Sequence, residues 1–265
     1  MLECVINISE GRRLDILDSI AGCAGPHVLD VHCDSDHNRS VLTVVGEPAA
    51  RAITMAAVDA LDIRDHQGAH PRIGVVDVVP FVPLGSTPFD EAIAARDRFA
   101  EWAATELTVP CFRYGPERTL PEVRRRAFDD LDPDTGPHHP HPSAGAIAVG
   151  ARPVLVAYNL WLAKPDLEMA RAIARAIRSP SVRALGLAVG EHVQVTMNLV
   201  DPSAVGPAHV YQQVAGITPV ERAELVGLAP MAVIEAAGRD NWARLDLAVD
   251  RTIEARLEAR GWSLD

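Results

Sequence analysis

The chain has 265 residues, of which 48% are hydrophobic, so it can bury the core of one large domain or of two small ones. Its 25 Lys and Arg against 36 Asp and Glu give a formal net charge of -11, and the acidic residues are dispersed along the chain. This balance excludes nucleic acid as an expected partner, because phosphate binding needs a net basic face. An anionic small molecule can still bind where local arginines overcome the negative field of the whole protein.

The cysteines and the apolar runs indicate the compartment. The four cysteines are scattered without a C-x-x-C pair, which is typical of reduced thiols in a cytosolic protein. No stretch approaches the roughly 18 uncharged residues that cross a bilayer. The short apolar run at residues 2–7 meets charge at Glu10, which is the wrong order for a signal peptide. We therefore expect a cytoplasmic protein without membrane contact.

The first half of the chain predicts alternating strands and helices. Residues 2–8 alternate as a strand does, and Ser9 is expected to cap the following helix, which carries Leu14, Leu17 and Ile20. The next elements expected are strands at 28–31, 40–45, 75–82 and 111–114, helices at 48–61 and 88–107, and a short helix capped by Thr119 whose arginines 124–126 face solvent. The first six elements have the order of the split βαβ arrangement.

Residues 132–145 interrupt this pattern. Four prolines and two glycines in this stretch exclude regular structure, so it must be a linker or a binding loop. Beyond it we expect strands at 146–149, 154–162 and near Leu225, a hairpin at 184–199, and helices at 166–178, 207–214, 231–237 and 245–260. We predict an α+β fold of two ferredoxin-like (split βαβ) subdomains, residues 1–145 and 146–265, that face each other across a ligand cleft.

Most of the ten histidines are grouped. The groups are His32 and His37 beside Asp34 and Asp36, His66 and His70 before Arg72, and His138, His139 and His141 in the 132–145 stretch. Imidazoles together with a carboxylate can hold zinc, but none of these groups has the spacing of a known metal site. We therefore predict no metal site, and a metal-dependent hydrolase that uses these clusters is kept as an alternative function.

His70 is the first candidate for chemistry. An imidazole can take and return a proton near neutral pH, and Pro71 limits the backbone of His70 to extended conformations. Gly68 and Gly74 let the chain bend tightly around it. The simpler alternative is a loop histidine that satisfies a buried backbone group. Arg39, directly before a strand, can clamp a carboxylate with two hydrogen bonds, although the polar residues before it are also ordinary turn formers.

Several motifs stand in the order and approximate spacing of a known family. They are ECVINISEG at 3–11, DHNRS at 36–40, GAHPRIG at 68–74, GAIAVGAR at 145–152, VTMNL at 195–199 and ELVGL at 224–228. On these motifs the chain resembles the glutamate formiminotransferase family over nearly its whole length, and it resembles only the transferase part of the animal bifunctional enzyme. The resemblance implies that a homodimer transfers the formimidoyl group of N-formimidoyl-L-glutamate to N5 of tetrahydrofolate in histidine degradation. A folate-binding homologue without this turnover is the second alternative.

The resemblance also implies roles for individual residues. His70 becomes the general acid/base, which collects the proton from N5 and delivers it to the glutamate nitrogen. Asn38, Arg39 and Arg72 are expected to bind the substrates, whose carboxylates suit the two arginines. The folate-contacting loop is expected to comprise Gly136, Pro137, His138, His139, Pro140, His141, Pro142, Ser143, Ala144 and Gly145.

Supporting roles fall to His32, Asp36, His66 and Asn159. His32 stands where the animal enzymes have the aspartate that pairs with the catalytic histidine, so it is open which acid orients His70. Trp161 stands at a position where the family commonly has a second asparagine.

Overall fold

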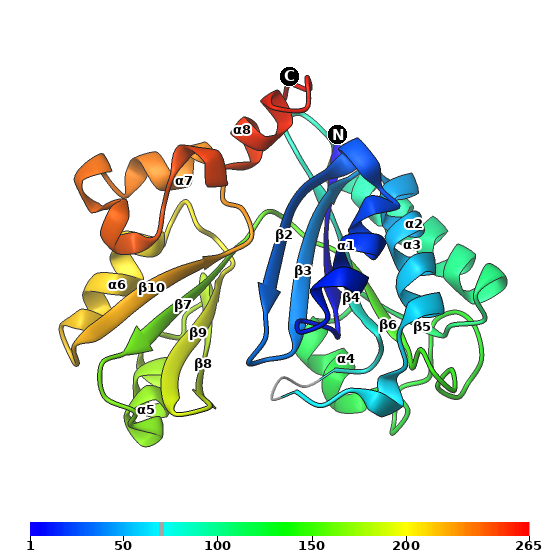
Figure 1. Cartoon of the computed structure of the whole chain (residues 1–265), viewed down its shortest axis with the longest axis horizontal. Coiled ribbons are helices and arrows are strands. Elements are labelled where there is room, and N and C mark those ends of the chain that lie inside the picture. The colour runs from blue at the N-terminus through cyan, green and yellow to red at the C-terminus, as the bar shows by residue number, and fades with distance from the viewer. Residues whose placement is uncertain (69–71, 265) are drawn as a thin grey trace. The chain divides into compact units, whose positions relative to one another are not determined.

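The computed structural model describes residues 1–68 and 72–264 (Figure 1). It contains two compact units, Met1–Pro153 with Leu264, and Val154–Ser263. Each unit has one β-sheet and its own hydrophobic core, so the fold is mixed α and β with two sheets, as the predicted α+β class requires. Within the described ranges, no helix has both the length and the apolar character needed to span a membrane.

The sheet of the first unit has six strands in the order β2-β3-β1-β4-β6-β5. The pairs among β1 to β4 are antiparallel, whereas β6 runs parallel to both of its neighbours. The strand bounds are β1 Leu2–Ile8, β2 Val28–Asp34, β3 Arg39–Val45, β4 Val76–Pro83, β5 Cys111–Tyr114 and β6 Ile147–Ala151. The predicted strands at 2–8, 40–45, 75–82 and 111–114 are confirmed to within one residue at either end.

Helices cover both faces of this sheet (Figure 1). The main core lies beneath α1 (Leu14–Gly22), α2 (Glu47–Ala60) and α3 (Phe89–Glu106), and a smaller core lies beneath α4 (Leu120–Arg126). Alternation along the strands separates the two cores, because Val79 faces the first and Val78 the second. Ile53 on α2 is fully buried, as the helical spacing predicted, and such burial stabilises the fold by roughly 1.5–3 kcal/mol.

The predicted capping role of Ser9 is wrong. Helix α1 begins at Leu14, and its N-cap residue Arg13 makes no capping hydrogen bond through its side chain. The hydroxyl of Ser9 instead donates to the carbonyl of Gly74 at 2.7 Å, and its backbone N–H donates to the carbonyl of Val75 at 2.8 Å. Ser9 therefore joins the end of β1 to the chain that leads into β4, a long-range contact that local spacing does not reveal.

The placement of residues 146–149 in the second subdomain is also wrong. Strand β6 lies between β4 and β5 in the first sheet, and all five of its residues are buried. A short apolar strand buried on both faces is typical of parallel pairing, which needs a neighbour along each edge. The 132–145 stretch, which holds only isolated bridges, therefore connects two parts of one unit rather than two subdomains.

The second unit has a four-stranded antiparallel sheet in the order β10-β7-β9-β8. The bounds are β7 Val156–Leu162, β8 Val182–Val189, β9 His192–Leu199, β10 Val220–Val226, α5 Leu167–Ile177, α6 Pro207–Ala215, α7 Met231–Ala236 and α8 Ile253–Glu258. The predicted hairpin is confirmed, and its turn lies at Gly190. The predicted helix at 166–178 is also confirmed as α5, which Asp166 caps.

The expected helix at 245–260 is wrong in its first part. Asp246 has a left-handed backbone (φ 54°) and ends a short 3₁₀ turn, and a second 3₁₀ turn follows at Val249–Arg251. The carboxylate of Asp246 accepts a hydrogen bond from the backbone N–H of Leu225 on β10. The helix begins only at Ile253, where the side chain of Thr252 provides the cap. Docking onto β10 thus overrides the helical spacing.

Candidate active site

The ends of four strands meet at one end of the first sheet. The register pairs Ile8 of β1 with Ser40 of β3 and with Val76 of β4, and it pairs Asp34 of β2 with Arg39 of β3. The polar residues that follow β1 and β2, or that begin β3 and β4, are therefore brought together although they lie far apart in the sequence.

Glycines allow the loops at this end to pack closely. A Cβ atom on Gly11 would lie 2.2 Å from the carbonyl oxygen of Asp34, and one on Gly68 would lie 2.4 Å from that of His37. A Cβ on Gly74 would lie 2.2 Å from the carbonyl oxygen of Ala146. These separations exclude any side chain, which explains why glycine occupies each position.

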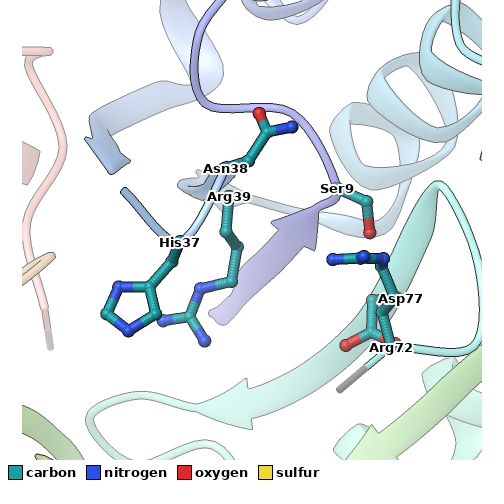
Figure 2. A pocket seen from close by; sticks show the side chains of 6 residues that line it. All are labelled: Ser9, His37, Asn38, Arg39, Arg72 and Asp77. Atoms are coloured by element: carbon teal, nitrogen blue, oxygen red, sulfur yellow. The ribbon is translucent and has the colours of Figure 1, made fainter. Parts of the chain in front are cut away.

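A pocket opens between these loops, lined by Ser9, His37, Asn38, Arg39, Arg72 and Asp77. Figure 2 shows the imidazole of His37 and the guanidinium of Arg39 on one side of it, and Ser9, Arg72 and Asp77 on the other. Two guanidinium groups at one pocket provide a local positive field that offsets the negative charge of the chain as a whole. The predicted substrate residues Asn38, Arg39 and Arg72 are thus brought together.

Asn38 connects the loops around the pocket. Its backbone is left-handed (φ 49°), a conformation that asparagine tolerates better than most residues. Its side-chain oxygen accepts from the backbone N–H of Gly11 at 2.9 Å, and its amide nitrogen donates to the carbonyl of Gln67 at 3.0 Å. The amide points away from His37 and Arg39 in Figure 2. This geometry favours a positioning role over the substrate contact expected for Asn38.

His37 has a carboxylate partner. Its Nδ1 lies within hydrogen-bonding distance of Oδ2 of Asp34, and its backbone N–H donates to Oδ1 of the same carboxylate at 2.9 Å. Burial by itself would raise the pKa of Asp34, but the hydrogen bonds from His37 lower it to about 2. Asp34 is therefore ionised at neutral pH and holds the nearly buried side chain of His37, which is only 7% exposed.

The predicted supporting residues Asp36 and His32 do not take part in the pair of Asp34 and His37. Asp36 is exposed at the turn, and its backbone N–H donates to Asp34, so the acid in the turn that holds an imidazole is Asp34. His32 is half-buried on β2 opposite Val41 and does not line the pocket.

His66 contacts Asn38, a residue that lines the pocket. Its Nδ1 is 3.4 Å from the amide nitrogen of Asn38. Burial lowers the pKa of His66, and the charge of Arg72 lowers it further. Arg72 also donates to the carbonyl of Gly68 at 3.3 Å. His66 is therefore neutral at physiological pH and suited to support rather than to proton delivery.

Asp77 anchors the chain on the other side of the pocket. It is 3% exposed, accepts from the backbone N–H of Ile73 at 2.7 Å, and forms an ion pair with Arg124 of α4. The expectation that residues 124–126 form a solvated face is thus wrong for Arg124. The ion pair fixes the start of β4 and with it Arg72.

The predicted folate loop, residues 136–145, lies next to the segment that leads into β4. The backbone N–H of Val75 donates to the carbonyl of Ala144 at 2.9 Å, and that of Ile63 donates to the carbonyl of Ser143 at 2.7 Å. His141 accepts through Nδ1 from the backbone N–H of Ala144 at 3.0 Å, which stabilises the turn. His138 and His139 are exposed.

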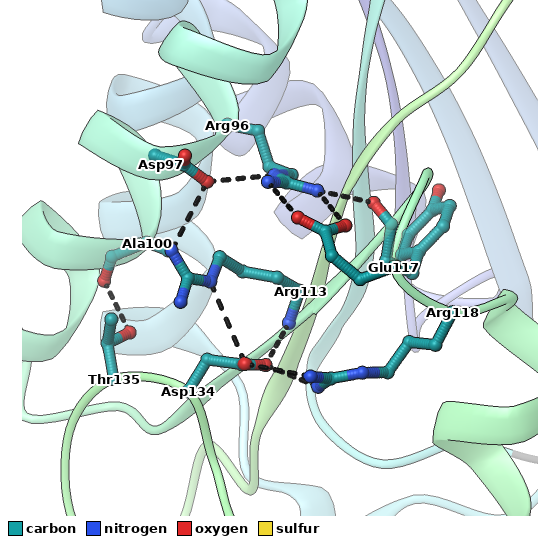
Figure 3. Close-up of polar contacts among 9 residues, drawn as sticks. Arg96, Asp97, Ala100, Arg113, Glu117, Arg118, Asp134 and Thr135 are labelled. Carbon is teal, nitrogen blue, oxygen red and sulfur yellow. Dashed lines mark hydrogen bonds and ion pairs between the residues drawn. The ribbon is translucent and has the colours of Figure 1, made fainter.

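The other end of this loop is anchored by a charged network (Figure 3). Asp134 accepts from Arg118 and from the backbone N–H of Arg113, each at 2.7 Å, and the hydroxyl of Thr135 donates to the carbonyl of Ala100 on α3. Arg96, also on α3, binds Glu117 through two hydrogen bonds of 2.7 Å. The rigid helix α3 thereby fixes where the loop begins.

Asn159 belongs to the second unit, where it forms part of a polar cluster. Its amide donates to Oε2 of Glu224 at 3.1 Å, and the indole N–H of Trp161 donates to the same oxygen at 2.8 Å. The guanidinium of Arg222 lies 4.1 Å from the ring centroid of Trp161. Trp161 thus donates to the same carboxylate as the neighbouring Asn159.

His70 lies outside the described residues, so its role stays a prediction. Over residues 1–68 and 72–264, no group of three or more His, Cys, Asp or Glu side chains has an arrangement suited to a metal ion. The sequence prediction missed Ser9, Asp34, His37 and Asp77 as residues of this site. For Asp34 and His37 a signal existed, because a carboxylate three residues before a histidine in a tight turn can reach its ring.

Comparison with known proteins shows the family of the chain. The sequence model of one protein family, described as the formiminotransferase domain, N-terminal subdomain, matches residues 1–152 of this chain. The glutamate formimidoyltransferase of Streptococcus pyogenes is 33% identical over 89% of this chain and 92% of its own length, and that of Thermoplasma acidophilum is 34% identical over 89% and 91%. The rat formimidoyltransferase-cyclodeaminase is 33% identical over 89% of this chain and 52% of its own length. The chain belongs to the formiminotransferase family and is a transferase.

Proposed function

We propose that this chain transfers the formimidoyl group of N-formimidoyl-L-glutamate to N5 of tetrahydrofolate, with His70 as general acid/base. The observation that carries the proposal is the pocket at the end of the first sheet, which is lined by Arg39 and Arg72. Arg72 and Gly68 flank the segment that contains His70, and Gly68 packs against the turn at His37. The names of the relatives support the same reaction.

The two guanidinium groups suit the substrates. Both formimidoylglutamate and the glutamate tail of the folate carry carboxylates, which arginine binds through paired, charge-assisted hydrogen bonds. Burial lowers the pKa of Arg72, and the charge of Asp77 offsets only part of this effect. Because Arg72 is partly desolvated, a bound carboxylate is screened less by water than it would be at the surface.

The chemistry requires one proton to move between two nitrogens. N5 of the folate attacks the formimidoyl carbon and gives up its proton, a tetrahedral intermediate forms, and the glutamate nitrogen leaves once it is protonated. An imidazole that collects the first proton and returns it to the glutamate nitrogen contributes roughly 10²–10⁴ to the rate.

The remaining parts of the proposal concern assembly and folate contacts. Residues 136–145 are proposed to contact the folate, which is supported by the backbone hydrogen bond from the N–H of Val75 to the carbonyl of Ala144 that holds the loop beside the start of β4. Both units follow the order strand, helix, strand, strand, helix, strand, and in both the first and last of these strands are neighbours, which supports a ferredoxin-like assignment. The homodimer, the cytoplasmic location and the ligand cleft stay predictions.

The proposal is tested by assaying wild-type protein and His70→Ala with formimidoylglutamate and tetrahydrofolate. We expect turnover in the wild type and a loss of roughly 10²–10⁴ in kcat for the variant. His209→Ala, an exposed histidine on α6, is the matched control and should turn over normally. Tight folate binding without turnover would instead support the binding alternative, and stoichiometric metal in the purified protein would support the hydrolase.

The arginine clamps are tested separately. Arg39→Ala and Arg72→Ala should each raise a substrate KM roughly 10- to 100-fold, because a hydrogen bond to a charged group is worth about 1.5–3 kcal/mol. Arg175→Ala, an exposed position on α5, should leave both KM values unchanged. Unchanged KM values in the Arg39 and Arg72 variants would place the carboxylate clamps elsewhere.

A further inference from the structure

The pairing of Asp34 with His37 is more specific than a turn requires. The turn is already closed by the backbone N–H groups of Asp36 and His37, which both donate to Oδ1 of Asp34. The second carboxylate oxygen, Oδ2, is directed at Nδ1 of the imidazole. One carboxylate oxygen thus closes the turn, and the other holds the side chain of His37.

This contact fixes the tautomer of His37. Asp34 is ionised at neutral pH, because the hydrogen bonds from His37 outweigh burial and lower its pKa to about 2. An ionised carboxylate only accepts hydrogen bonds, so Nδ1 must carry the proton. In the neutral ring the lone pair is then on Nε2, which is the nitrogen that can take up a further proton.

The imidazole belongs to the site by position. His37 lines the pocket together with Arg39, Arg72 and Asp77, and it is the one histidine among the described residues that line it. Asp34, from β2, is its carboxylate partner, and Asp77 at the start of β4 forms its own ion pair with Arg124. The carboxylate that orients an imidazole in this pocket is thus Asp34.

We propose that His37, positioned by Asp34, is a second proton-transferring residue of the formimidoyl transfer. The proposal rests on the proposed function above and divides the role given there to His70: His37 takes up the N5 proton, and His70 keeps the delivery of a proton to the glutamate nitrogen. As N5 of tetrahydrofolate bonds to the formimidoyl carbon, Nε2 of neutral His37 accepts the N5 proton. Protonated His70 donates its proton to the glutamate nitrogen as the bond between that nitrogen and the carbon breaks and its electron pair returns to nitrogen. His37 then releases its proton to water and His70 takes one up, so protons balance over the cycle.

The sequence left open which acid orients the catalytic histidine. His32 occupies the position where a family aspartate was expected, and it does not line the pocket. The chain instead places its carboxylate on a different imidazole. A base that is separate from the acid avoids the need for one ring to move a proton between two nitrogens within a single encounter.

His37→Asn is the first test variant, because its amide can still donate to Asp34 but cannot accept a proton as imidazole does. We expect kcat to fall roughly 10²–10⁴-fold and substrate KM values to stay within about threefold. Asp34→Asn should lower kcat at least about 10-fold through the wrong tautomer, and Asp34→Glu should restore part of the loss. His209→Asn should keep wild-type kinetics.

A measurement without turnover separates this proposal from the proposed function. In the wild type, ¹⁵N spectra of the histidine side chains should assign a protonated Nδ1 and an unprotonated Nε2 to His37, and Asp34→Asn should abolish this preference. Two results would overturn the role of Asp34 and His37 while leaving the proposed function intact. One is the opposite tautomer of His37, and the other is a kcat of His37→Asn within about threefold of that of an active wild type. A wild type that shows no turnover would overturn the proposed function and, with it, the catalytic part of this assignment.

Discussion

Replacing Arg96 by Met tests how far the buried charge network of the first unit stabilises the fold. The guanidinium is 1% exposed and donates to Glu117, to Asp97 at 2.9 Å and to the carbonyl of Tyr114 at 3.2 Å. Met keeps the apolar stem and removes every one of these donors. Breaking a buried ion pair costs about 3–5 kcal/mol, but Glu117 is 46% exposed and can rehydrate, so we expect a loss of about 2–4 kcal/mol.

Arg98→Met is the matched control on the same helix. Arg98 is 59% exposed and pairs with Glu47 at 2.8 Å, so its removal should cost about 0.2–1 kcal/mol. Urea unfolding of the two variants and the wild type gives the free energies, and hydrogen exchange of peptides from α3 and β5 locates the effect in the first unit. A loss for Arg96→Met no larger than that of the control would refute the reasoning.

The pH dependence provides an independent check on the same pair. The hydrogen bonds from Arg96 lower the pKa of Glu117 to about 2, against an ordinary value of 4.5. A carboxylate whose folded-state pKa is depressed stabilises the fold fully above its unfolded pKa and loses that contribution as pH falls through the folded pKa. The difference between wild type and Arg96→Met should therefore shrink between about pH 4.5 and pH 2.

Two further predictions concern the site. Gly74→Ala should destabilise the protein by about 1–3 kcal/mol, because the added Cβ forces the segment before β4 away from the loop that precedes β6. Gly22→Ala in α1 is the control: a Cβ added there meets open space, so the same urea titration should show neutral or slightly increased stability. Burial lowers the pKa of His66, so below about pH 6.5 the unfolded state binds more protons than the folded state and the stability of the fold should decrease on acidification. The variant His66→Gln lacks this group, so its Tm should drop less between about pH 7.5 and 5.5 than the Tm of the wild type or of the control His209→Gln.

Part of the site could be anticipated from local sequence, but the position of Ser9 and the ion pair of Asp77 could not. Arg39 was identified because a guanidinium beside a strand suits a carboxylate, Arg72 was expected from the family resemblance, and both line the pocket. Ser9 was misassigned because the pattern of a serine before a helix also fits a helix cap. Asp77 sits inside an apolar strand, where sequence offers no indication that Arg124 of a distant helix will neutralise it.

The features that could be read from the sequence are local. The alternation of β1, the helical stripe of α2 and the capping box at Thr119 depend on residues within a few positions of one another, and each of these is found in the structure. Such patterns are reliable because the physical interaction that produces them lies within the segment itself.

Which segments meet is visible only in the folded chain. The parallel insertion of β6 between β4 and β5, the break of the last helix at Asp246 and the convergence of Ser9, His37 and Arg72 each depend on pairing across many residues. Loop closure and strand register govern these contacts, and a single sequence does not show which of several apolar strands will pair. The partner of His37 needed both levels: the three-residue spacing brings Asp34 within reach, and the sheet end places the pair in a pocket.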